Sequence, residues 1–242
     1  MQQFTEYSAI AIRALEFNPR NHDVVAKKQE VLKLIEQHYT KQPSTILFCG
    51  FSPLMLASTS KNLYLTAAND QTKNLLDSLN IKYTYINEKD LGSFSKKFDW
   101  VVATDEYFTF ARSENEQKIL IEQAVNLAKD LVITTLRDYK NQDYKDKEFS
   151  QPLAIHRGKD HLIFLEYHNY DFNDKNSWDT SVYEMQGNEV SVSGPFNRRS
   201  MFFKQLAKFS IDAGAKNFYV HKNLMYKSLI KKNYEYVISI EL

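Results

Sequence analysis

Apolar and polar residues alternate along the middle of the chain in segments that fit strands and helices in turn. Short apolar runs, and one stretch that alternates apolar with polar residues, predict strands at residues 46–49, 63–67, 81–86, 98–103 and 131–135. Apolar positions at helical spacing predict helices at residues 71–79 and 114–128. Strands that alternate with helices over short links indicate a parallel sheet with helices on both faces.

The first 42 residues do not alternate between strand and helix, and their pattern predicts two helices before the first strand. Apolar positions from Tyr7 to Phe17 form a partial helical stripe, and Pro19 marks a break because proline disfavours helix before it. A second apolar stripe runs over residues 23–42 and ends before Pro43. The pattern therefore predicts an N-terminal helical extension over residues 1–42.

The last hundred residues change character again. Residues 137–153 are polar and read as a long loop, and a plausible hairpin turn lies at residues 186–188. Strands are predicted at residues 161–170, 181–185, 189–193, 217–221 and 236–240, and helices at residues 200–213 and 224–232. We therefore expect a small β insertion over residues 137–199, after the fifth strand. No internal repeat or linker divides the chain, so one domain over residues 1–242 is expected.

The composition argues against disulfides, cysteine-based zinc sites and membrane spans. The chain has 242 residues, a net charge of +1, only 6 glycines and one cysteine. A single thiol, Cys49, forms neither an internal disulfide nor a cysteine-based zinc site, and its place in a predicted strand favours a core residue over a nucleophile. No stretch approaches 18 apolar residues, so no membrane span is expected. These features predict a cytoplasmic protein.

The order of the predicted elements resembles the class I S-adenosylmethionine-dependent methyltransferase fold. The end of the chain carries the resemblance best, with a helix, the turn Ala213-Gly214-Ala215 and two closing strands. The resemblance covers residues 44–135 and 200–242. It implies a Rossmann-like, mostly parallel seven-stranded sheet in the order 3-2-1-4-5-7-6 with the seventh strand antiparallel. It also implies a transferase that uses S-adenosylmethionine and methylates a small molecule, or another acceptor, by in-line transfer.

The resemblance assigns cofactor contacts to the ends of three predicted strands. After the first strand, only Gly50 matches the family's glycines, which allow the backbone to approach the methionine part of the cofactor. Phe51 and Ser52 follow where further glycines are usual. Thr104 follows the fourth strand, and the resemblance places it at the same cofactor site.

Two acidic positions are further candidates. Asp70 lies 20 positions after Gly50 and is assigned the ribose hydroxyls; its alternative role is to cap the following helix. Asp90 and Leu91, after the third strand, are assigned to the adenine, and the alternative is a solvated loop.

The resemblance implies catalytic residues directly after the fourth strand, at the position that faces the transferred methyl group in the family. Asp105 or Glu106 could accept a substrate proton, and Tyr107 could line the pocket. The alternative for Asp105 is a helix cap. The prolines that amino-directed nucleic-acid methyltransferases carry at this position are missing.

Residues 198–232 form a basic segment. Nine cationic side chains face one carboxylate, Asp212, which leaves a local charge of +8. Arg198 and Arg199 are the candidates for binding an anionic substrate. The interleaved aromatic residues make nucleic acid a possible partner, and a solvated helix face is the alternative.

Two questions stay open at this point. His161, Glu166 and His168 are potential metal ligands, but residues 161 and 166 of one strand lie on opposite faces, so no metal is predicted.

The incomplete glycine loop leaves a non-catalytic binding or assembly module of the same fold as the alternative function. Nothing in the sequence indicates the oligomeric state.

Overall fold

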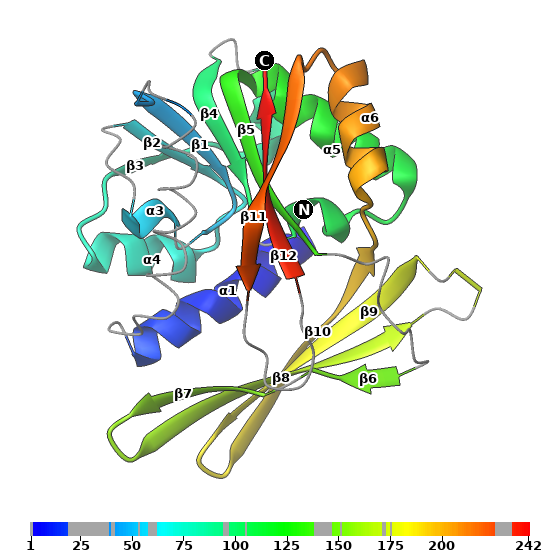
Figure 1. The fold of residues 1–242 in the computed structure, drawn as a ribbon. Coiled ribbons are helices and arrows are strands. Elements are labelled where there is room, and N and C mark those ends of the chain that lie inside the picture. Colours follow the sequence, from blue (N-terminus) through cyan, green and yellow to red (C-terminus); the bar gives the residue numbers. More distant parts are fainter. Residues whose placement is uncertain are drawn as a thin grey trace.

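The computed structural model describes residues 2–18, 39, 42–52, 54–57, 62–93, 97–104, 106–137, 147–150, 152–170, 173–174, 176–225 and 234–242. Its strands form two sheets, with helix α1 (Gln2–Phe17) drawn between them in Figure 1.

The larger sheet has seven strands, in the order β11-β12-β5-β4-β1-β2-β3. The strands are β1 (Thr45–Cys49), β2 (Asn62–Thr66), β3 (Tyr83–Tyr85), β4 (Phe98–Ala103), β5 (Ala128–Arg137), β11 (Asn217–Met225) and β12 (Tyr234–Glu241). β1 pairs in parallel with β2 and β4, whereas β12 is antiparallel to β5. The predicted order and the antiparallel last strand are confirmed.

Apolar side chains cover both faces of this sheet. Along β4, Val101 and Ala103 belong to one buried cluster, and Trp100 and Val102 belong to another. Successive strand residues point to opposite faces, so these are two separate cores. Figure 1 shows α5 (Glu114–Leu127) and α6 (Phe203–Asp212) together on one side, and α3 (Leu54–Ala57) and α4 (Asp70–Ser78) on the other. Within the described residues, no helix is long and apolar enough to cross a membrane.

The second sheet is the predicted β insertion after β5. It is antiparallel and consists of β6 (Lys147–Phe149), β7 (Leu153–Arg157), β8 (Asp160–Tyr170), β9 (Ser177–Gln186) and β10 (Glu189–Arg199). The loop predicted for residues 137–153 was wrong in part, because β5 includes Arg137, β6 spans residues 147–149 and β7 starts at Leu153. These two edge strands are only three and five residues long, too short to give an alternating apolar signal.

Three other predicted elements differ from the structure or lie outside it. Apart from residues 39 and 42, the helix predicted over residues 23–42 lies outside the described residues. The helix predicted over residues 224–232 was wrong at its start, because Leu224 and Met225 pair with β12 as part of β11. Residues 226–232 of that segment lie outside the described residues. The helix predicted from residue 200 begins at Phe203, since β10 continues to Arg199.

Helix α1 contacts both sheets. Its apolar residues Ile12 and Leu15 are buried in the core on the α4 side of the larger sheet. Its polar residues reach the second sheet, where Arg13 Nε lies 2.7 Å from Glu184 Oε2 and the Tyr7 hydroxyl donates to Glu166. The segment predicted as an N-terminal extension thus links the two sheets.

Asp99 at the start of β4 should make stability depend on acid pH. Its Oδ2 accepts hydrogen bonds from the backbone N–H groups of Ser44 and Thr45 and from the Ser44 hydroxyl. Burial alone would raise the pKa of this carboxyl, but these bonds and Lys129 outweigh it and lower the pKa to about 2. Since the unfolded value is about 3.9, its stabilisation is full above pH 4 and is lost as the pH falls toward 2. Urea denaturation of Asp99→Asn between pH 5 and pH 2 should show a weaker pH dependence than the wild type. An unchanged slope would contradict this assignment.

Candidate active site

The ends of β1, β2 and β4 share an unusual backbone feature. Gly50, Ala67 and Glu106 directly follow or come soon after these strands, and their φ angles are +85°, +52° and +60°. Positive φ is uncommon for residues other than glycine, and such conformations cluster at functional sites. β1 lies between β2 and β4, at the position where open α/β sheets bind ligands beyond their strands' carboxyl ends. This edge is therefore the candidate site.

Gly50 is in close contact with helix α1. A Cβ atom built on Gly50 would lie 2.1 Å from Cε1 of Phe4, so the phenyl ring rests against the glycine. Phe4 is fully buried, and its ring makes edge-to-face contacts with Tyr107 and Phe110 at centroid distances of 5.0 and 5.1 Å. Within this structure, the space beside Gly50 is filled by a side chain of the protein.

The structure brings Ser52 and Thr104 together, as expected for two residues of one site. The Thr104 hydroxyl donates to Ser52 Oγ at 2.9 Å, and both residues are buried. Phe51 is also buried, and it belongs to the same core cluster as Ile12 and Leu15 of α1. Cofactor contacts by these residues stay a prediction, and the geometry of Phe51 favours a packing role.

Asp70 does not reach into this edge. It is the first residue of α4, its side chain is 95% exposed, and its carboxylate lies 3.5 Å from Lys73. The N-cap of α4 is Asn69, whose side chain accepts from the Thr72 N–H. A carboxylate in the first turn interacts favourably with the helix dipole, which explains Asp70 without a ligand. The predicted ribose contact is not favoured by this geometry.

Glu88 was not chosen from the sequence, yet it is a half-buried carboxylate at this edge. It begins the 3₁₀ helix η1 (Glu88–Ser93) after β3. Its Oε1 atom is buried and has no hydrogen-bond partner among the described residues, and burial raises the pKa of the carboxyl. The predicted Asp90, two residues on, is exposed, while Leu91 is a core residue. A short polar loop gives no periodicity, so the sequence could not distinguish Glu88 from Asp90.

The charge of Glu88 acts on two buried groups at the strand ends. Burial, and after it the charge of Glu88, raises the pKa of the Cys49 thiol to about 12. Burial and then Cys49 and Glu88 raise the pKa of Tyr107 as well. Glu88 therefore lies near the ends of β1 and β4, and its Oε1 is an acceptor that no described residue uses. The predicted role of Tyr107 in lining the substrate pocket stays a prediction, and Asp105 lies outside the described residues.

Glu106 and Arg198 form a buried ion pair that joins the two sheets. Arg198 is 2% exposed and Glu106 is 4% exposed, and Arg198 Nη2 contacts Glu106 Oε2. Arg137 Nε lies 2.7 Å from the other carboxylate oxygen. Arg198 also donates to Thr109 Oγ1 from Nε at 3.2 Å and from Nη2 at 2.9 Å. Its guanidinium lies over the rings of Phe110, Tyr7 and Trp178 at 4.6–5.5 Å.

This arrangement favours a structural role for both residues. Both oxygens of Glu106 contact arginines, which opposes the expected role as proton acceptor. Arg198 is enclosed by rings and paired, which opposes direct contact with a substrate. The proton-accepting role of Glu106 and the substrate contact of Arg198 otherwise stay predictions. The sequence could not reveal that these two residues, 92 positions apart, form a pair.

A second carboxylate continues this polar network on the inner face of β8. Glu166 accepts from the Tyr7 hydroxyl, and its Oε2 lies 3.4 Å from His168 Nε2. Burial alone would raise the pKa of Glu166, but the positive charges of His168, Arg137 and Arg198 lower it. The carboxylates of Glu106 and Glu166 thus balance the two arginines. No group of three or more potential metal ligands exists in the part of the chain that the structure describes.

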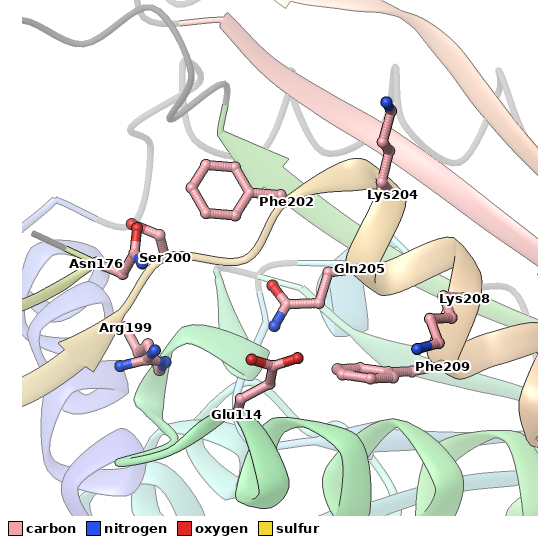
Figure 2. A pocket seen from close by; sticks show the side chains of 9 residues that line it. All are labelled: Glu114, Asn176, Arg199, Ser200, Phe202, Lys204, Gln205, Lys208 and Phe209. Carbon is pink, nitrogen blue, oxygen red and sulfur yellow. The ribbon is translucent and has the colours of Figure 1, made fainter.

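Arg199 points away from this network, because successive strand residues face opposite sides. It pairs with Asp174 and also contacts Ser177. It lines an open cavity of about 400 Å³ between β10, α5 and α6. Figure 2 shows Glu114, Gln205 and Lys208 pointing into a common space, whereas Lys204 projects away. The substrate contact predicted for Arg199 stays a prediction.

Only part of the basic segment shares a surface in the described part of the chain. Arg199, Lys204 and Lys208 line the cavity described above, whereas Arg198 is buried and Arg199 is paired with Asp174. Lys227, Lys231 and Lys232 lie outside the described residues. Polyanion binding through this segment has no support from this arrangement.

No protein-family model and no curated protein matches the sequence. Solved structures do match. DesVI from Streptomyces venezuelae superposes with a TM-score of 0.67 at 12% identity, over 95% of this chain and 97% of that chain. An S-adenosylmethionine-dependent methyltransferase from Clostridium acetobutylicum gives 0.66 at 13% identity over 98% of both chains. CalS10, an amino pentose methyltransferase from Micromonospora echinaspora, gives 0.64 at 10% identity over 90% of both.

These neighbours match nearly the whole chain, including the second sheet. At such low identity these matches show the fold alone, and the strand order and the antiparallel β12 agree with that fold. The chain has the Rossmann-like fold of class I S-adenosylmethionine-dependent methyltransferases.

Proposed function

We propose that the protein is an S-adenosylmethionine-dependent methyltransferase that acts on a small molecule. The observation that carries this proposal is the edge beyond β1, where Gly50 adopts a positive φ and Glu88 has a buried oxygen without a partner in the described part of the chain. The neighbour CalS10 is an amino pentose methyltransferase, which supports a small acceptor such as an amine or alcohol. We further propose one domain over residues 1–242 and a cytoplasmic location.

The residues of this edge fit the cofactor in two respects. Gly50 lacks a Cβ on the side where the three nearest atoms all belong to the phenyl ring of Phe4. Glu88 supplies an acceptor for hydroxyl or amino groups, and a buried acceptor without a partner costs free energy that a donor would recover. They depart from the family's pattern at the end of β2, where Ala67 and Ala68 stand in place of an acidic residue.

The work of this chain would be to hold and shield the reactants. S-adenosylmethionine, when bound, supplies an electrophilic methyl group, so the protein need only orient the acceptor and exclude water. Helix α1 and the second sheet cover the edge, and the paired carboxylates and arginines give that cover a fixed, neutral polar lining. No described group is required to form a covalent bond.

Glu88→Gln should weaken binding of S-adenosylhomocysteine roughly 10- to 150-fold, because a charge-assisted hydrogen bond contributes about 1.5–3 kcal/mol. Isothermal titration calorimetry measures this directly. Asp90→Asn is the matched control, since Asp90 is exposed two residues away, and its affinity should stay within about twofold. Equal effects of the two substitutions would contradict the role of Glu88.

The second candidate is a non-catalytic module of the same fold. Phe4 against Gly50 and the two alanines after β2 favour it. The distinguishing measurement is calorimetry on the variant Phe4→Ala. If neither it nor the wild type binds S-adenosylmethionine or S-adenosylhomocysteine at millimolar concentration, the non-catalytic function is the better conclusion.

A further inference from the structure

Two histidines face each other across the β7–β8 hairpin. His156 of β7 lies opposite His161 of β8, and their Nδ1 atoms are 2.7 Å apart. Both side chains are exposed. One ring nitrogen of such a pair donates its proton and the other accepts it, and both nitrogens are metal ligands when unprotonated. The hairpin therefore brings two potential ligand atoms to one point.

The pair lies on the outer face of the second sheet, which is directed away from α1. Ile155 and Leu162, the chain neighbours of the two histidines, are each 2% exposed and point inward. Successive strand residues point to opposite faces, so the two histidines point outward. The sheet itself therefore separates the pair from the buried polar network on its inner face.

Other contacts fix the backbone that carries the two imidazoles. The Asn18 side chain donates to the carbonyl of His156 at 2.8 Å, and Arg157 lies over the ring of Phe17 at 4.7 Å. β7 and β8 are paired through the whole hairpin, up to Arg157 opposite Asp160. An ion that binds both rings would therefore find them already positioned, and little ordering of the chain would oppose its binding.

The spacing of the two nitrogens favours an ion whose neighbouring ligands lie at right angles. Imidazole nitrogens bind Zn²⁺ at about 2.0–2.1 Å, and at such lengths two nitrogens lie about 2.8–3.0 Å apart at 90° but about 3.3–3.4 Å apart at the tetrahedral angle. The observed 2.7 Å is closer to the first value, and exposed rings can turn so that both nitrogens face one ion. Square-planar or tetragonal coordination is typical of Cu²⁺ and Ni²⁺, and Cu²⁺ binds such sites more tightly.

No described carboxylate joins the two histidines. Asp160 points to the other face of the hairpin, where its Oδ2 lies 4.0 Å from Nη2 of Arg157. The part of the chain that the structure describes contains no group of three or more potential ligands. A donor set of two imidazoles suits Cu²⁺, Ni²⁺ or Zn²⁺ and does not suit Mg²⁺ or Ca²⁺, which prefer oxygen. Water, or a group of another molecule, would fill the remaining positions around the ion.

We propose that His156 and His161 bind one divalent transition-metal ion, with Cu²⁺ preferred, and that this ion fastens β7 to β8. Among the described strands β7 pairs with β8 alone, so it is an edge strand held by one ladder. An ion bound from both strands adds a second link, and it stabilises the hairpin because only the folded hairpin presents both ligands together. The site does not depend on the function proposed above.

Calorimetric titration with CuCl₂ tests the two ligands. His156→Asn and His161→Asn should each weaken the tightest site at least about 10-fold, because the remaining imidazole loses a partner held at high effective concentration. Asp160→Asn is the matched control, since it removes an exposed carboxylate next to His161 and leaves both imidazoles in place; its affinity should stay within about threefold. The losses should be smaller for Zn²⁺ than for Cu²⁺, because tetrahedral binding needs a wider pair.

Two further measurements complete the test. Pulsed electron paramagnetic resonance of the wild type with half an equivalent of Cu²⁺ should detect two imidazole ligands, and this experiment needs no variant. Hydrogen exchange followed by mass spectrometry should show that one equivalent of Cu²⁺ slows exchange in β7 at least about threefold in the wild type but not in His156→Asn.

Each unfavourable outcome overturns a stated part of the proposal. A spectrum with a single imidazole, or equal losses for His161→Asn and Asp160→Asn, would mean that the pair is not the site. Larger losses for Zn²⁺ than for Cu²⁺ would contradict the right-angled geometry and the preferred ion. Unchanged exchange in β7 when Cu²⁺ is bound would show that the ion does not fasten this strand.

Discussion

Glu106→Gln should destabilise the protein by about 3–5 kcal/mol, the usual result of removing one partner of a buried ion pair. The substitution preserves size and shape, so it leaves no cavity. It deprives Arg198, which is 2% exposed, of its carboxylate, and Thr109 then remains as its hydrogen-bond partner among the contacts described above. Guanidinium denaturation followed by circular dichroism gives the change in the free energy of unfolding.

Two further variants test the reason for this loss. Glu122→Gln removes one partner of an exposed pair with Lys118 on α5 and should change stability by less than about 0.5 kcal/mol. The double variant Glu106→Gln with Arg198→Met should recover much of the loss, because no unpaired charge is then buried. A loss under 1 kcal/mol for Glu106→Gln would mean that Arg198 is not enclosed as described.

The architecture of the larger sheet was predictable because its signal is local. Most of its strands are short apolar runs, and helical stripes at residues 71–79 and 114–128 follow two of them, so the alternation indicates a parallel sheet. The last helix and strands of the chain were equally predictable, since Gly214 follows the end of α6 and two strands come after it. The strand order then followed from resemblance to a known fold, which is a comparison of patterns rather than a deduction from single residues.

The site was less predictable because its contacts join distant parts of the chain. Gly50, Ser52 and Thr104 could be placed at the ends of β1 and β4 from the sequence, since they follow apolar strands, and their cofactor contacts stay a prediction. That Arg198 would turn inward to Glu106 while Arg199 turned outward depends on the register of β10 in the second sheet. The strand was expected to end at residue 193, so this register was not available from the sequence.

Helix α1 shows the same limit most clearly. Its apolar stripe was visible, but its partner was not, because a stripe states only that one face is buried. Phe4 lies before the stripe that was recognised and reaches Gly50, 46 positions later, through tertiary packing. The glycine was read as a contact for a ligand, and the structure gives it a contact with the protein itself.

Gly50→Ala should therefore destabilise the protein by about 2–5 kcal/mol. The positive φ of this residue costs an alanine about 1–2 kcal/mol. The new methyl group would also lie 2.1 Å from Phe4 and force its ring out of a packed site, which adds about 1–3 kcal/mol. Thermal and urea denaturation give the sum of the two contributions.

Two comparisons divide that sum into its parts. Gly187→Ala is the matched control, since its φ of +59° is also positive but no atom lies within 4 Å of the added carbon, so it should lose only the backbone part. In a Phe4→Ala background the ring is gone, and Gly50→Ala should again cost only about 1–2 kcal/mol. Full additivity of the two substitutions would mean that Phe4 does not rest on Gly50. The expected non-additivity of about 1–3 kcal/mol measures how firmly the ring of Phe4 is held against the end of β1.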